Sequence, residues 1–164
     1  MKHFYIKQKV FAFTDRYKVF DEKQNVVYHV ESKLFSLSHR MNFFRDADNT
    51  HLFVLRRQIL ALLPRYFVTT PLGEDVATIQ KRFTVLKHKL DISSTLGNFT
   101  MTGDFLAHDF AVESGGRTVL EFHKKWISWG DSYEITIHDE TNTEFLLALV
   151  LLIDDCLHDE NRRH

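Results

Sequence analysis

Residues 66–83 read YFVTTPLGEDVATIQKRF, and this stretch contains the unit from which the chain is built. A run rich in aromatic and β-branched residues, YFVTT, is followed by the turn-forming residues 71–75, PLGED. A second short run, DVATIQKR, occupies residues 75–82. Two such runs separated by a turn that contains proline and glycine predict an antiparallel β-hairpin.

The same unit recurs along the chain. The predicted first strands begin at Tyr17, Met41, Tyr66, Leu90, Phe110 and Tyr133, at intervals of 24, 25, 24, 20 and 23 residues. Polar turns at residues 21–25, 46–50 and 114–117 lead into second strands at residues 26–33, 51–58 and 118–125. The unit between residues 98 and 109 is the least regular, and Gly97 and Gly103 predict bulges or sharp bends there. The repeat predicts ten to twelve antiparallel strands in sequential order.

A chain of antiparallel hairpins has exposed sheet edges, and closure into a barrel removes them. A barrel wider than about eight strands has an empty interior unless something fills it. Residues 145–153, FLLALVLLI, contain no polar residue, and Thr141 with Glu144 fits a capping box that would begin a helix. A buried strand is the competing interpretation of this run. We predict a mainly β fold, a closed antiparallel barrel of about twelve strands threaded by a hydrophobic C-terminal α-helix, as one domain spanning residues 1–164.

Four segments of the chain resemble a known family. They are residues 5–9 (YIKQK), residues 27–37 (VYHVESKLFSL), residues 103–105 (GDF) and residues 153–159 (IDDCLHD). Together they resemble the bacterial members of the LURP-one-related family, over residues 4–160. That family is similar in fold to Tubby proteins and phospholipid scramblases, so the resemblance implies a twelve-stranded barrel around a hydrophobic C-terminal helix. Tubby domains hold phosphoinositides through basic surface residues, and scramblases are associated with lipid movement and calcium.

Cations recur near the end of successive hairpins. The series is Lys9, Lys33, Arg57, Lys81 and Lys124. Barrel geometry would bring some of these residues to one rim, where they could hold an anionic ligand such as a phospholipid or phosphoinositide headgroup. The alternative interpretation is that they solvate the rim and discourage edge pairing. A second series, Arg16, Arg40, Arg65 and Lys89, either adds to the same surface or lies opposite it, and the sequence leaves both placements open.

Composition and motifs exclude several other functions. Twenty-one Lys and Arg balance twenty-two Asp and Glu, and no RNP, helix-turn-helix or zinc-finger pattern is present, so nucleic-acid binding is not predicted. The sequence lacks G-x-S-x-G, P-loop and Rossmann motifs, and we therefore predict a protein that is not an enzyme. Its histidines are scattered, and its acidic tail at residues 154–160 departs from an EF-hand loop. We predict no metal site and no cofactor.

The sequence also favours a location in the cell. Cys156 is the only cysteine, the first ten residues lack the apolar run of a signal peptide, and residues 145–153 are too short to cross a bilayer. We expect a cytoplasmic protein, at most peripheral at a membrane. The expected function is non-catalytic binding of an anionic ligand, and the alternative is a protein-interaction or regulatory module without a small-molecule ligand.

Overall fold

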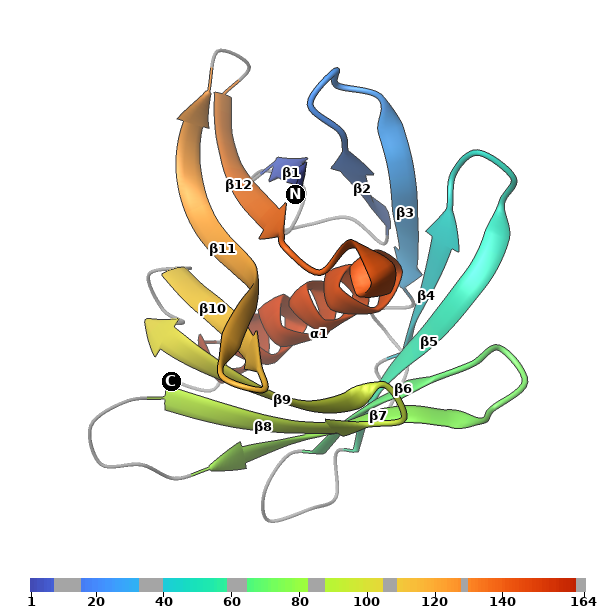
Figure 1. The fold of residues 1–164 in the computed structure, drawn as a ribbon. Coiled ribbons are helices and arrows are strands. Elements are labelled where there is room, and N and C mark those ends of the chain that lie inside the picture. The colour runs from blue at the N-terminus through green and yellow to red at the C-terminus, as the bar shows by residue number, and fades with distance from the viewer. Residues whose placement is uncertain are drawn as a thin grey trace.

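The fold is a closed barrel of twelve antiparallel strands, with one helix running through its interior (Figure 1). This computed structural model describes residues 1–7, 16–32, 40–58, 65–82, 88–104, 109–127 and 130–161. Each strand pairs with its neighbours in sequence, and β1 pairs with β12 to close the barrel. This arrangement confirms the predicted fold class.

The elements follow one another with short connections. Their bounds are β1 Lys2–Lys7, β2 Arg16–Phe20, β3 Val26–Ser32, β4 Arg40–Arg45, β5 Thr50–Gln58, β6 Arg65–Thr69, β7 Asp75–Arg82, β8 His88–Ser94, β9 Gly97–Asp104, β10 Asp109–Ser114, β11 Arg117–Ile127, β12 Gly130–Ile137, the 3-10 helix η2 Glu140–Asn142, and α1 Thr143–Asn161. The predicted strand 75–82 has the same bounds as β7, and most of the others differ by one to three residues.

The simple order of the strands gives the barrel two different ends. Tight turns join β2 to β3, β4 to β5, β6 to β7, β8 to β9 and β10 to β11, and η2 enters α1 beside them; we call this the turn end. At the opposite end, which we call the connector end, the odd-numbered strands finish and the even-numbered strands begin. The second strand of each predicted hairpin therefore runs toward the connector end.

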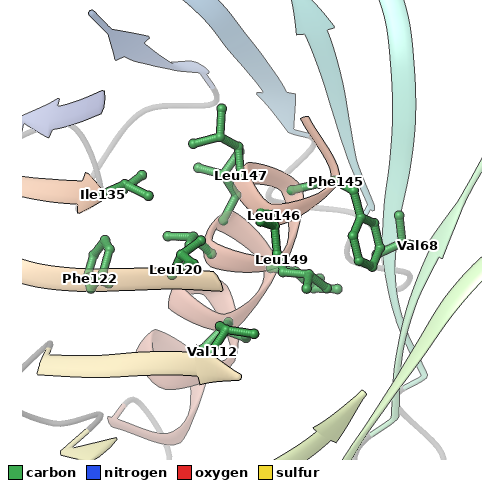
Figure 2. Packing of buried hydrophobic residues seen from close by; sticks show 14 of the residues in the cluster. Val68, Val112, Leu120, Phe122, Ile135, Phe145, Leu146, Leu147 and Leu149 are labelled. Atoms are coloured by element: carbon green, nitrogen blue, oxygen red, sulfur yellow. The ribbon is translucent and has the colours of Figure 1, made fainter. Parts of the chain in front are cut away.

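The core fills the space between the wall and the helix. Side chains on alternate positions of the strands point inward, as in β4, where Met41 and Phe43 are buried and their neighbours are more exposed. All nine residues at positions 145–153 are buried. Figure 2 shows helix residues such as Leu146 and Leu149 between Val68 on one wall and Val112 on another. The run of 145–153 is thus a helix, and its apolar character on every side matches its position at the centre.

One local prediction, the start of the helix, was wrong. Thr141 and Glu144 do not form a capping box at the start of α1, because residues 140–142 form η2, which Asp139 caps by accepting a hydrogen bond from the Thr141 amide. The Glu144 carboxylate instead binds the guanidinium of Arg45, at 2.8 and 2.9 Å. A cross-barrel ion pair therefore fixes the first turn of the helix.

The sequence predicted bulges or sharp bends at Gly97 and Gly103. No bulge forms at either residue, since the pairing of β9 with β8 and β10 continues without a shift, and a sharp bend occurs at Gly97. Gly97 ends the β8–β9 turn with a φ of 124°. Gly103 lies where β9 and β10 approach closely, and a β-carbon there would be 2.4 Å from the carbonyl oxygen of Asp109. The lack of a side chain at Gly103 thus permits the close contact.

Candidate anion-binding rim

The barrel topology brings the described members of both predicted cation series to the connector end. Arg57, Lys81 and Lys124 lie toward the ends of β5, β7 and β11, which all finish there. The second series begins the even-numbered strands, with Arg16, Arg40, Arg65 and Lys89 at or next to the first residues of β2, β4, β6 and β8. Of the two placements that the sequence left open, the described residues therefore favour the first: the second series lies at the same end of the barrel as Arg57, Lys81 and Lys124.

Side chains are described for only two of the five predicted site residues. Lys9 and Lys33 lie outside the described residues, and for Lys81 only the backbone is described, paired with Leu90. The side chain of Arg57 is half-buried, and that of Lys124 is exposed. Two of the five predicted side chains can thus be placed within the rim.

Strand register shows which side of the wall these two cations face. Arg57 pairs with Tyr66, and Lys124 pairs with Tyr133. Both tyrosines are buried in the core, and directly paired residues of antiparallel strands project from the same face. Arg57 and Lys124 therefore lie on the inward-facing side of their strands, at the mouth of the barrel. Water can reach their charged groups there.

A neighbouring pocket adds an arginine that the sequence analysis did not single out. A cavity of about 380 Å³ lies over β5, β6 and β7, and it is lined by Arg56, Arg57, Gln58, Phe67 and Asp75. Arg56 is exposed and pairs with Phe67. Consecutive strand residues project from opposite faces, so Arg56 lies on the outer face of the wall while Arg57 continues the inward row. The Arg56 guanidinium can bind a phosphate in a bidentate manner, and Asp75 in the same lining restricts where an anion can sit.

Carboxylates also occur at the connector end, so the rim is mixed in charge. Asp109 begins β10 and forms an ion pair with His123, with 2.7 Å between Oδ1 and Nδ1. The last turns of α1 run toward the same end and carry Asp154, Asp155, Asp159 and Glu160. An anion would therefore bind a local group of cations, such as the arginines on β5, and not the whole circumference.

The outer face of β12 carries a second polar group. The Glu134 carboxylate is 9% exposed, and it accepts a hydrogen bond from the Tyr5 hydroxyl at 3.0 Å. The imidazole of His3 lies 3.3 Å from the same carboxylate. Burial, together with the neighbouring carboxylate, raises the pKa of Tyr5 to about 12, so the phenol is no nucleophile near neutral pH. These contacts join β1 to β12, and we assign them to barrel closure.

Two further features bear on what the site can bind. In the part of the chain that the structure describes, no three His, Cys, Asp or Glu side chains are placed to hold a metal ion. No described helix has the length and apolar character that a membrane span requires.

The chain is similar to known proteins in both sequence and fold. The uncharacterized protein YxjI of Bacillus subtilis (strain 168) is 29% identical over 160 residues, which cover 98% of this chain and 96% of that protein. An X-ray structure of an Arabidopsis thaliana protein superposes with a TM-score of 0.68 at 18% identity, over 94% of this chain and 90% of the other, and it has the same Tubby-like fold. The LURP-one-related family model matches residues 2–154. The chain therefore belongs to the LURP-one-related family.

Proposed function

We propose that this protein is a non-catalytic binding protein that holds an anionic ligand at the connector end of its barrel, with a phosphorylated headgroup of a membrane lipid as the ligand class. The observation that supports the proposal is that the described members of two cation series lie at one end of the barrel. Lys9, Lys33, Arg57, Lys81 and Lys124 form the first series, and the cations that begin the even-numbered strands form the second.

The chemistry of arginine supports a phosphate over a carboxylate ligand. Arg56 and Arg57 are consecutive, and both line the cavity over β5 to β7. A guanidinium presents a planar set of donors that matches phosphate oxygens, and it stays charged at every physiological pH. Phe67 gives the same cavity an apolar wall, against which the non-polar part of a headgroup would pack. The ligand would sit at the rim or on the outer wall, because the helix fills the barrel.

Vesicle sedimentation tests the proposal. Vesicles of phosphatidylcholine with about 30 mol% phosphatidylserine should sediment the protein at about 50 mM salt and release it at about 500 mM, because screening weakens exposed charge pairs. Replacement of Lys33, Arg57 and Lys81 by glutamine should weaken binding by about a hundredfold, since each basic residue near the surface contributes about 1 kcal/mol.

A matched control removes the same charge from the turn end. Lys2, Lys23 and Arg117 are exposed cations there, and their replacement by glutamine should leave vesicle binding unchanged. Equal losses in the two triple variants, or no sedimentation at low salt, would contradict the proposal.

A further inference from the structure

The turn end of the barrel has a surface with a different chemistry from that of the connector end. All of its connections are described: residues 21–25, 46–49, 70–74, 95–96, 115–116 and 138–142. Within the described part of the chain, the large hydrophobic side chains that are exposed are those of Met1, Leu72 and Leu96, and all three lie at this end. Leu72 and Leu96 occupy the tips of two neighbouring hairpins, β6–β7 and β8–β9.

Leu72 is held outward by a rigid turn. The Thr70 amide donates to the Glu74 carbonyl at 2.8 Å, and the Gly73 amide donates to the Thr70 carbonyl at 3.0 Å. Pro71 restricts the backbone before Leu72, and Gly73 after it has a φ of 92°. Leu72 is 90% exposed in this fixed position. A partner that covers it would lose little chain entropy from the turn, which favours binding.

Leu96 stands at the edge of a cavity beside the helix entrance. The cavity has a volume of about 450 Å³, and its apolar lining comes from Phe4, Tyr28, Phe53, Leu96 and Phe145. Residues 140–144 and Lys2 form its polar side. This volume is within the range of small-ligand pockets, and it accommodates an apolar side chain from another molecule together with part of its backbone. The mouth of the barrel thus offers a receptor for an apolar anchor.

The charges around this cavity indicate the charge that a partner would carry. The acidic residues at the turn end are Asp21, Glu22, Asp46, Asp48, Glu74, Asp75, Asp139, Glu140 and Glu144. The cations there are Lys2, Lys23, Arg45, Arg117 and the N-terminal ammonium, and both Lys2 and the ammonium pair with Glu140. Arg45 is already engaged by Asp48 and Glu144. Glu22 and Glu74 lie exposed on turns. An excess of carboxylates would repel an anionic membrane and attract a cationic segment.

We propose that the turn end is a docking surface for a protein segment in which basic residues flank an apolar side chain. The apolar side chain would enter the 450 Å³ cavity beside Leu96, a second apolar contact would cover Leu72, and the basic residues would face the surrounding carboxylates. The two ends of the barrel would then bind partners of opposite charge. This surface is separate from the anion site at the connector end.

A pair of synthetic peptides tests this docking surface. The probe is a fluorescent, amidated peptide of sequence KLKFKK, and the control peptide KSKSKK has the same charge without apolar anchors. Anisotropy should show that the probe binds about tenfold or more tightly than the control, because burying one leucine or phenylalanine contributes at least that factor. Amide shifts in labelled protein should concentrate at residues 70–74, 95–96 and 140–145.

Variants of the protein test which residues bind the peptide probe. Leu72→Ser combined with Leu96→Ser should remove the preference for the apolar probe, while Glu22→Gln combined with Glu74→Gln should weaken both peptides. Asp104→Asn combined with Asp109→Asn removes the same amount of negative charge from the connector end, and this matched control should bind the probe normally. Equal affinity for the two peptides, shifts at the connector end, or normal binding by the leucine variant would overturn the proposal. None of these results depends on whether vesicles bind.

Discussion

At the scale of single residues, Gly103 lies where strands β9 and β10 approach each other closely. A β-carbon there would lie 2.4 Å from the Asp109 carbonyl oxygen and 2.5 Å from the Cα of Phe110. Both neighbours are backbone atoms, so relief requires β9 and β10 to separate. The φ of 150° at Gly103 adds strain for any residue with a side chain.

Gly103→Ala should therefore destabilise the protein by about 3 kcal/mol, the range expected for overpacking and backbone strain together. Urea unfolding of the purified variant measures this loss. Gly97→Ala is the control, because Gly97 has a φ of 124° and nothing within 4 Å of the added atom, and it should cost only about 1 kcal/mol. Equal losses in the two variants would show that the contact with Asp109 is not the cause.

Tyr5 predicts a dependence of stability on alkaline pH. Its pKa is raised to about 12 by burial and by the hydrogen bond to Glu134, while an unfolded tyrosine titrates near 10. The folded state therefore retains the phenol proton longer than the unfolded state. The stabilisation from Tyr5 is complete below pH 10, and it is lost as the pH rises toward 12.

Unfolding free energies of the wild type and Tyr5→Phe, measured at intervals from pH 8 to pH 12, test this prediction. The advantage of the wild type should be constant below pH 10 and should shrink above it. A difference that stays constant up to pH 12 would contradict the raised pKa.

At the scale of elements, the central helix and its entry decide whether the barrel can form. Nine consecutive helix residues, 145–153, are buried against the wall. Arg45 on β4 binds Glu144 in the first turn of α1, and the two carboxylates of Glu144 and Asp48 raise the pKa of its guanidinium. This pair joins a wall strand to the helix across 99 residues of sequence.

Leu149→Asp should prevent folding, because Leu149 is fully buried and an unpaired carboxylate there costs several kcal/mol, a large part of the total stability. Circular dichroism and thermal unfolding measure the effect. Leu72→Asp adds the same charge at a 90% exposed position and should melt like the wild type. A cooperatively folded Leu149→Asp protein would show that residues 145–153 do not fill the barrel.

The elements were predictable from the sequence where the signal is local. Runs rich in aromatic and β-branched residues, bounded by turn residues, predicted β7 with its observed bounds and most other strands to within three residues, and the apolar run of 145–153 indicated the helix. The helix start was not predictable, because the partner of Glu144 is Arg45, which is close only after the barrel has closed.

The candidate site was predictable only in part, for a related reason. The sequence repeat implied that cations such as Arg57 and Lys124 share one end, since equivalent strands run in the same direction. The face on which each side chain lies depends on pairing with Tyr66 and Tyr133, which the repeat does not specify. The cavity that contains Arg56 requires the neighbouring strands β6 and β7, so no single segment of sequence contains it.

At the scale of the whole molecule, the near-neutral net charge of −1 conceals a division between the two ends. Cations begin or end most strands at the connector end, while the turns at the other end are mainly acidic. The buried residues 145–153 of the helix occupy the barrel interior, and both proposals place binding at an end of the barrel. The two proposals therefore assign an anionic ligand to one end and a cationic partner to the other.

The most direct measurement of the central claim is a titration of isotope-labelled protein with inositol hexakisphosphate, a soluble phosphorylated headgroup, followed by backbone amide chemical shifts. Saturable shifts are expected at the connector end, including the end of β5 at residues 56–58 and the start of β6 at residues 65–67, and these shifts should be lost in Arg57→Gln combined with Lys124→Gln. Shifts confined to the turns at residues 21–25, 46–49 and 70–74, or no saturable shifts, would contradict this claim.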